Sequence, residues 1–109
     1  MKQLSDKLRK ILGELREQFE EVYGDRLVEI VLYGSQARGD ADAESDIDVL
    51  VVLEGPVDQT REYERTRDWR LDLLLAEGAL VSIVFMDEDR FTHRHGPFLR
   101  NVRREGIRV

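Results

Sequence analysis

The segment 31–53, VLYGSQARGDADAESDIDVLVVL, constrains the fold of this chain more than any other stretch. A first apolar run ends at Tyr33, the pair Gly34-Ser35 follows, and a second apolar run extends over 47–53. Short runs rich in β-branched and aromatic residues, bounded by glycine and aspartate, are typical of strands. The segment therefore predicts a strand, a tight turn, a short helical or loop excursion and a second strand.

Two aspartates open the second predicted strand. Side chains alternate along a strand, so Asp46 and Asp48 should share one face about 7 Å apart, while Ile47 points into the core. Mg²⁺ prefers one or two carboxylates completed by water and substrate phosphates, and paired Mg²⁺ ions serve phosphoryl-type transfer. The spacing therefore predicts a metal site.

The glycine-serine pair favours an anion on the other side of the same site. Gly34 can adopt a backbone conformation with positive φ and lets a ligand approach closely. Ser35 adds a hydroxyl and a backbone N–H at the start of a short helix, where unsatisfied donors favour anions. A triphosphate would then lie between this pair and metals held by Asp46 and Asp48.

These residues resemble a known signature. Gly-Ser, ten residues and Asp-x-Asp, with Ala37-Arg38-Gly39 in the gap and Ser45 before the first aspartate, is similar to the motif of minimal nucleotidyltransferases of the polymerase-β-like superfamily. The resemblance implies an α/β (α+β) nucleotidyltransferase fold, a small mixed sheet with helices packed on it. It also favours an antiparallel pair of strands over a crossover connection.

The resemblance further implies a function. Asp46 and Asp48 would be the catalytic metal ligands for two Mg²⁺ ions, and Gly34, Ser35 and Arg38 would contact ATP or another nucleoside triphosphate. AMP would pass to a hydroxyl of a partner protein, a HEPN-domain toxin encoded by an adjacent gene, with this chain as its antitoxin. From the residues alone, Arg38 could instead pair with nearby Asp40 or Asp42.

One position departs from the family pattern. Active relatives carry a third carboxylate on the third strand, predicted here over 80–85, and its place is taken by Ser82. Serine is no base at neutral pH, and losing a general base costs about 10²–10⁴-fold in rate. Asp87, Glu88 or a partner could supply the acid. The alternative is a catalytically decayed binding module that covers its partner.

A third interpretation, a small-molecule nucleotidyltransferase of the aminoglycoside type, would need an acceptor pocket that only a dimer could build. The sequence does not decide the oligomeric state, so a homo-oligomer remains compatible with it.

The remaining elements are predicted from periodicity and turn residues. Apolar residues at three- and four-residue steps from Leu4 to Val22 predict an amphipathic helix that ends at Gly24. Asp58 or Thr60 could begin a second helix to about residue 77. A polar turn over 87–89, a short helix over 97–104 and an edge strand over 107–109 complete the chain. The apolar set expected for the second helix is Tyr63, Thr66, Trp69 or Arg70, Leu73, Leu74 and Ala76.

Composition sets the outer limits. The 109 residues predict one domain, 1–109, and the net charge of −6 argues against general nucleic-acid binding, which depends on Lys and Arg. The absence of cysteine excludes a disulfide frame and a zinc cluster. No apolar run approaches the ~18 residues of a membrane span, so a cytoplasmic protein is expected. Six arginines from Arg90 onward could meet an acidic partner or form a solvated helix face.

Overall fold

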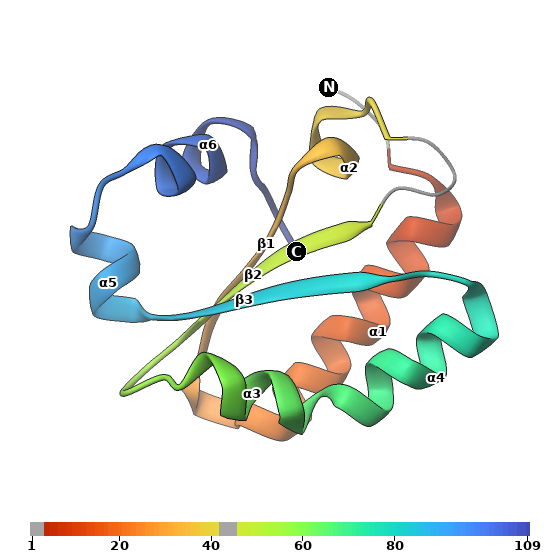
Figure 1. Ribbon diagram of the computed structural model, residues 1–109, viewed down its shortest axis with the longest axis horizontal. Helices are drawn as coiled ribbons and strands as arrows, with labels where there is room; N and C mark the ends of the chain where they lie inside the picture. Colours follow the sequence, from red (N-terminus) through yellow and green to blue (C-terminus); the bar gives the residue numbers. More distant parts are fainter. Residues whose placement is uncertain (1–3, 42–45) are drawn as a thin grey trace.

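The computed structural model describes residues 4–41 and 46–109, arranged as a four-stranded mixed sheet with helices packed on it (Figure 1). Ser45 and the possible Arg38–Asp42 pair lie outside the described residues. The strand order is β3-β2-β1-β4, and the predicted α/β architecture is confirmed. The strands are β1 (Leu27–Tyr33), β2 (Ile47–Leu53), β3 (Val81–Asp87) and β4 (Ile107–Arg108).

Strand directions bring the ends of three strands together. β1 and β2 are antiparallel, with Tyr33 opposite Asp48, which confirms the pairing that the sequence favoured over a crossover. β2 and β3 are parallel, with Asp48 beside Ser82. The C-terminal end of β1 therefore meets the N-terminal ends of β2 and β3.

The first helix, α1 (Asp6–Tyr23), begins where Ser5 accepts a hydrogen bond from the Leu8 N–H at 3.1 Å, and it ends at Gly24 as predicted. Val22 was expected in the core but is 36% exposed. Tyr23 is buried instead, because it lies four residues after Phe19 and its hydroxyl bonds to Glu62.

The single helix predicted up to residue 77 is two helices, α3 (Gln59–Arg65) and α4 (Arg67–Glu77). The break falls at the buried Thr66, whose hydroxyl donates to the Tyr63 carbonyl at 3.0 Å, a local bond that competes with helical pairing. Asp58, and not Thr60, caps α3 by accepting from the Arg61 N–H. In α4, Leu73 is buried, but Leu74, expected in the core, is 39% exposed.

The C-terminal region differs from the sequence prediction at one element. The polar turn expected over 87–89 is the start of α5 (Glu88–His93), because Asp87 accepts from the Arg90 N–H at 2.8 Å and so caps a helix. The short helix predicted from Pro97 is confirmed as α6 (Pro97–Glu105), and β4 is the expected edge strand.

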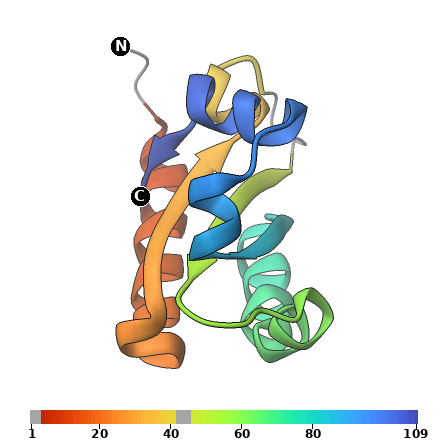
Figure 2. The same cartoon turned by 90° about the vertical axis from the view of Figure 1, so that its left-hand side faces the viewer.

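The two faces of the sheet have separate helical covers. Side chains of α1, α3 and α4 pack on one face, below the strands in Figure 1. Those of α5 and α6, which face the viewer in Figure 2, pack on the other face around Leu50 and Val52. Asp48 has the same parity in β2 as Leu50 and Val52, so it belongs to the α6 side. Within the described part of the chain, no helix combines the length and apolar character that crossing a membrane requires.

Candidate functional site

Gly34 and Asp48 are in direct contact at the corner after β1. Gly34 has φ 75° and ψ −157°, a backbone region that is essentially restricted to glycine. A Cβ atom at this position would lie 2.6 Å from Asp48 Oδ2. Glycine is therefore required twice, for its backbone conformation and for the space that the Asp48 carboxylate occupies.

Asp46 and Asp48 form a pair of interacting carboxylates. Asp46 is exposed and Asp48 is partly buried. Burial raises the pKa of Asp48 above its ordinary value, the negative charge of Asp46 raises it further, and Arg38 opposes both effects. The site thus concentrates negative charge that a cation would relieve.

The donor set fits a magnesium ion that also binds substrate. Among residues 4–41 and 46–109, no three or more acidic or histidine side chains are grouped to hold a metal by themselves. Mg²⁺ characteristically takes one or two carboxylates and completes its shell with water and phosphate oxygens. Asp46 and Asp48 could therefore hold such an ion together with a nucleotide, but would not form a closed protein cage.

Tyr33, the last residue of β1, lies opposite Asp48 and is affected by the same carboxylate. Burial, followed by the negative charge of Asp48, raises the pKa of Tyr33 to about 12. Its ring packs edge-on against Phe98 of α6, with centroids 5.3 Å apart. The rings of Tyr33 and Phe98 therefore line the α6 side of the corner.

Ser35 begins the short helix α2 (Ser35–Arg38), as the sequence predicted. The helix ends at Gly39, whose N–H donates to the Ser35 carbonyl at 2.9 Å, and Ala37 is buried against the core. Within the described residues the Ser35 hydroxyl makes no hydrogen bond to protein. It is thus available to a ligand beside Gly34.

Arg38 pairs with two carboxylates. Its Nε lies 3.2 Å from Asp40 Oδ2, one of the partners considered from the sequence, and its Nη1 lies 3.2 Å from Glu105 Oε1. Both contacts raise the pKa of Arg38, Asp40 the more strongly. The guanidinium is therefore directed toward Asp40 and the C-terminal end of α6.

Glu105 is a residue of this site that sequence reasoning missed. Its Oε1 also accepts a hydrogen bond from the Gly34 N–H at 3.4 Å. Both contacts join residues that are 67 and 71 positions apart, beyond the reach of any local pattern. The one sequence signal is its position directly before Gly106, at the end of the predicted last helix.

The third strand places Ser82 beside Asp48, as the family pattern implied. Asp87, one source considered for the missing acid, pairs with Leu53 at the other end of β2. Asp87 lies five positions after Ser82 along β3, or about 16 Å at ~3.3 Å per residue. Asp87 and the following Glu88 therefore do not lie at the Asp48 end of the sheet.

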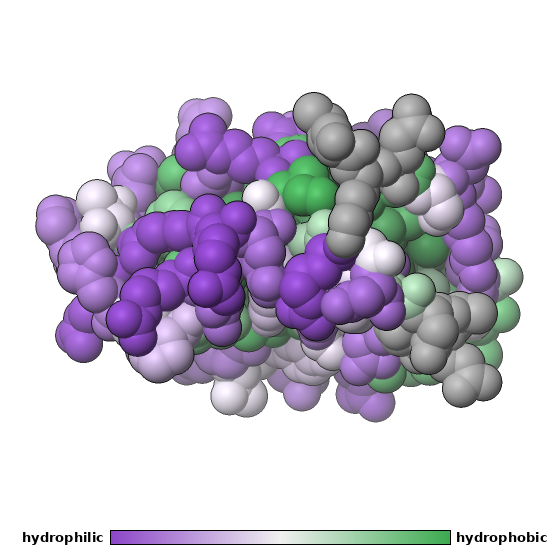
Figure 3. Space-filling model, turned by 90° about the horizontal axis from the view of Figure 1, so that it is seen from above, coloured by the Kyte–Doolittle hydropathy of each residue, from purple (hydrophilic) through white to green (hydrophobic). Residues whose placement is uncertain are grey.

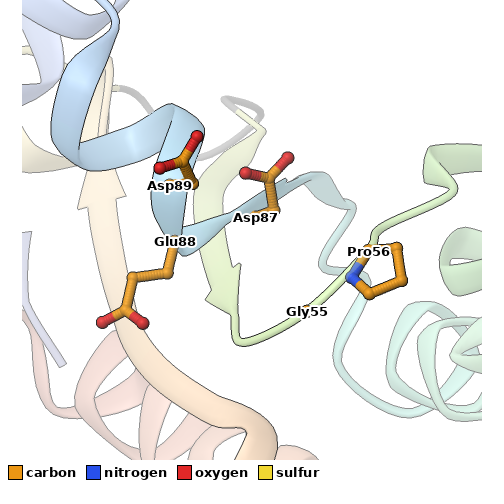
Figure 4. A pocket seen from close by; sticks show the side chains of 5 residues that line it. All are labelled: Gly55, Pro56, Asp87, Glu88 and Asp89. Carbon is orange, nitrogen blue, oxygen red and sulfur yellow. The ribbon is translucent and has the colours of Figure 1, made fainter.

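Those two acids instead line a separate open pocket of about 260 Å³, together with Gly55, Pro56 and Asp89 (Figure 4). In this view the Glu88 carboxylate points away from those of Asp87 and Asp89. The three carboxylates thus do not converge on one point.

Comparison with known proteins identifies the family. The family model described as a nucleotidyltransferase domain matches residues 8–108, a range that spans β1 to β4 and every candidate site residue. The chain belongs to the nucleotidyltransferase domain family. The resemblance based on the Gly-Ser and Asp-x-Asp residues is confirmed.

A relative in Methanocaldococcus jannaschii, named "Putative protein adenylyltransferase MJ0604", is 36% identical over 98 residues, which cover 89% of this chain and 92% of the relative. A "putative nucleotidyltransferase" from Sulfolobus solfataricus has a similar crystal structure, with TM-score 0.63 and 22% identity over 91% of this chain and 76% of that one. A structure titled "toxin-antitoxin with AMP-PNP" gives TM-score 0.61 and 20% identity over 87% of this chain and 69% of that one. The two solved structures establish the shared nucleotidyltransferase fold.

Proposed function

We propose that this nucleotidyltransferase-family chain is a protein adenylyltransferase that binds ATP with Mg²⁺ at the corner formed by Gly34, Ser35, Asp46 and Asp48. The observation that carries the proposal is the position of the Asp48 carboxylate, which fills the space where a side chain on Gly34 would lie and interacts with the carboxylate of Asp46. The name of the Methanocaldococcus relative supports adenylyl transfer to a protein.

In the proposed reaction, a hydroxyl oxygen of the acceptor attacks the α-phosphorus of ATP in line with the leaving group. The bond from the α-phosphorus to the bridging oxygen breaks, and pyrophosphate leaves with the electron pair. Bound magnesium would neutralise the negative charge that develops on the phosphates. Asp46 and Asp48 would hold the cation, and the Ser35 hydroxyl would contact a phosphate. Most of the rate would come from positioning and charge stabilisation.

The acceptor in this proposal is a hydroxyl on a HEPN-domain toxin encoded by the adjacent gene, with the single domain 1–109 acting as the cytoplasmic antitoxin. Support comes from the fold shared with a protein in a toxin–antitoxin structure that contains AMP-PNP. The acceptor proton leaves to water or to a base on the partner, because Ser82 occupies the position of the third carboxylate.

Labelling tests the proposal directly. The chain and its neighbour-encoded protein are incubated with α-labelled ATP and Mg²⁺, and label is expected on the neighbour. The double variant Asp46→Asn, Asp48→Asn should abolish it. The control double variant Asp68→Asn, Asp72→Asn removes the same charge from the exposed surface of α4 and should leave labelling intact. Equal labelling by both double variants would refute the assigned site.

Ser82 favours a second candidate, a binding module that has lost transfer chemistry. A serine beside Asp48 leaves two carboxylates for cation binding and no strand-borne base. This candidate predicts a stable complex with the neighbour protein and no label transfer. Transfer gained on Ser82→Asp substitution would support it, because the substitution restores only the missing acid.

A further inference from the structure

The geometry points to Glu105 as a positioning residue for the nucleotide site, whose carboxylate fixes the Gly34 corner and the α2 helix against the C-terminal end of α6. This inference rests on the proposed function, because it assigns a role to a side chain beside the proposed phosphate contacts. Both views of the fold place α2 next to the end of α6 (Figures 1 and 2).

One carboxylate joins three parts of the chain. Glu105 Oε1 accepts from the Gly34 N–H at 3.4 Å and lies 3.2 Å from Arg38 Nη1, while Oε2 lies 3.4 Å from the same nitrogen. Gly34 belongs to the corner after β1 and Arg38 is the last residue of α2. The carboxylate therefore restrains both ends of the four-residue helix that carries Ser35.

Glu105 is itself held firmly. A Cβ on Gly106 would collide with the Val102 carbonyl and with Val31 Cγ1, so the backbone after Glu105 packs directly on β1. Ile107 then pairs with Leu32 in the sheet. The backbone that carries Glu105 is thus fixed relative to the strand whose end forms the corner, as a positioning role requires.

The Glu105 carboxylate is largely shielded from solvent, which strengthens its contact with Arg38. The Glu105 side chain is 16% exposed, whereas that of Arg38 is 46% exposed. Figure 3, which looks down on this end of the molecule, shows mainly hydrophilic residues over α5 and α6. A charge-assisted bond to a largely shielded carboxylate is stronger than an exposed surface pair. Arg38 would accordingly support the site through Glu105 and α2.

A carboxylate beside phosphate-binding donors could instead compete with the nucleotide. The anchoring of Glu105 argues against this, because Gly106 packs on β1 and keeps the backbone of Glu105 at the corner, where its carboxylate is bound to Gly34 and Arg38. The Ser35 hydroxyl, in contrast, makes no bond to the described protein and stays available to a phosphate. The two roles predict opposite changes in nucleotide affinity when the Glu105 carboxylate is removed. Loss of a competitor would tighten nucleotide binding, whereas loss of a support would weaken it.

The test measures nucleotide affinity by calorimetric titration with ATP and Mg²⁺, and it compares variants of Glu105 with a control variant of Glu29. Glu105→Ala should weaken binding about tenfold to a hundredfold, the factor expected for one charge-assisted hydrogen bond. Glu105→Gln should weaken it less, because its amide oxygen still accepts from Gly34. The control Glu29→Gln removes the negative charge from the pair of Glu29 with Arg108, and it should leave affinity within about twofold of the unaltered chain. The Glu29 side chain is 17% exposed, which matches Glu105.

Hydrogen exchange without nucleotide provides an independent measurement. Amides of residues 34–39 should exchange faster in Glu105→Ala than in the unaltered chain or in Glu29→Gln. Unchanged exchange or unchanged affinity in Glu105→Ala, or tighter affinity in either Glu105 variant, would overturn the positioning role. If the unaltered chain binds no nucleotide, the proposed function fails, and exchange alone decides whether Glu105 holds the corner.

Discussion

Substituting Gly34 by alanine should lower both the stability of the fold and the affinity for nucleotide. At φ 75° and ψ −157°, alanine would occupy a region whose cost is about 1–3 kcal/mol. Its Cβ would also lie 2.6 Å from Asp48 Oδ2. That oxygen is the end of a side chain that can rotate, so the collision should be relieved by turning the carboxylate, at about 0.5–1.5 kcal/mol.

A second glycine isolates the effect of the collision. Gly55 has φ 85°, close to that of Gly34, but a Cβ there would meet nothing within 4 Å. Gly55→Ala should therefore carry only the backbone cost of about 1–2 kcal/mol. Gly34→Ala should therefore lose more free energy of unfolding in urea than Gly55→Ala, and only Gly34→Ala displaces a carboxylate of the site.

Titration with ATP and Mg²⁺ measures the difference. Displacing the carboxylate that is proposed to hold the cation should lower nucleotide affinity at least tenfold, or about 1.4 kcal/mol, in Gly34→Ala. Gly55→Ala should bind like the unaltered chain. If Gly34→Ala is folded and binds nucleotide with unaltered affinity, then the contact between this corner and Asp48 has no part in nucleotide binding.

Three further changes test the packing and the site. Tyr23→Phe should cost about 1–3 kcal/mol in urea unfolding, because the buried Glu62 loses its hydroxyl donor at 3.0 Å. The Gln59 amide bonds to two backbone groups of β3, the strand at the sheet edge. Gln59→Ala should therefore cost a similar amount of free energy, and light scattering should detect more concentration-dependent aggregation because the strand edge is uncovered. Ser82→Asp should lower the melting temperature without Mg²⁺ and enlarge the stabilisation by Mg²⁺, because it adds a carboxylate beside Asp48.

Sequence patterns predicted the parts of the site that depend on short-range geometry. Alternation in β2 places Ile47 in the core and Asp48 on the opposite face, and the Gly34-Ser35 turn leads into the predicted short helix. The break at Thr66 was missed because it depends on a local side-chain bond to the Tyr63 carbonyl that competes with the helix.

The contact of Glu105 with the corner depends instead on tertiary structure. It forms because Gly106 and β4 return the chain to β1, and that close approach of backbone to strand leaves no periodic signal in the sequence. Contacts that form where the chain folds back on a distant strand cannot be predicted from a single sequence, whereas contacts within one strand or turn can be.

The sheet topology limits where a third acid could come from. The C-terminal end of β1 and the N-terminal ends of β2 and β3 meet at the corner, so a strand-borne acid must occupy the position of Ser82, and Asp87 lies at the far end. Glu105 reaches the corner from α6, but its carboxylate is bound to Gly34 and Arg38. Within the described residues, transfer would therefore proceed without a dedicated base, and its rate should depend on how acidic the acceptor hydroxyl is or on a base that the acceptor protein brings.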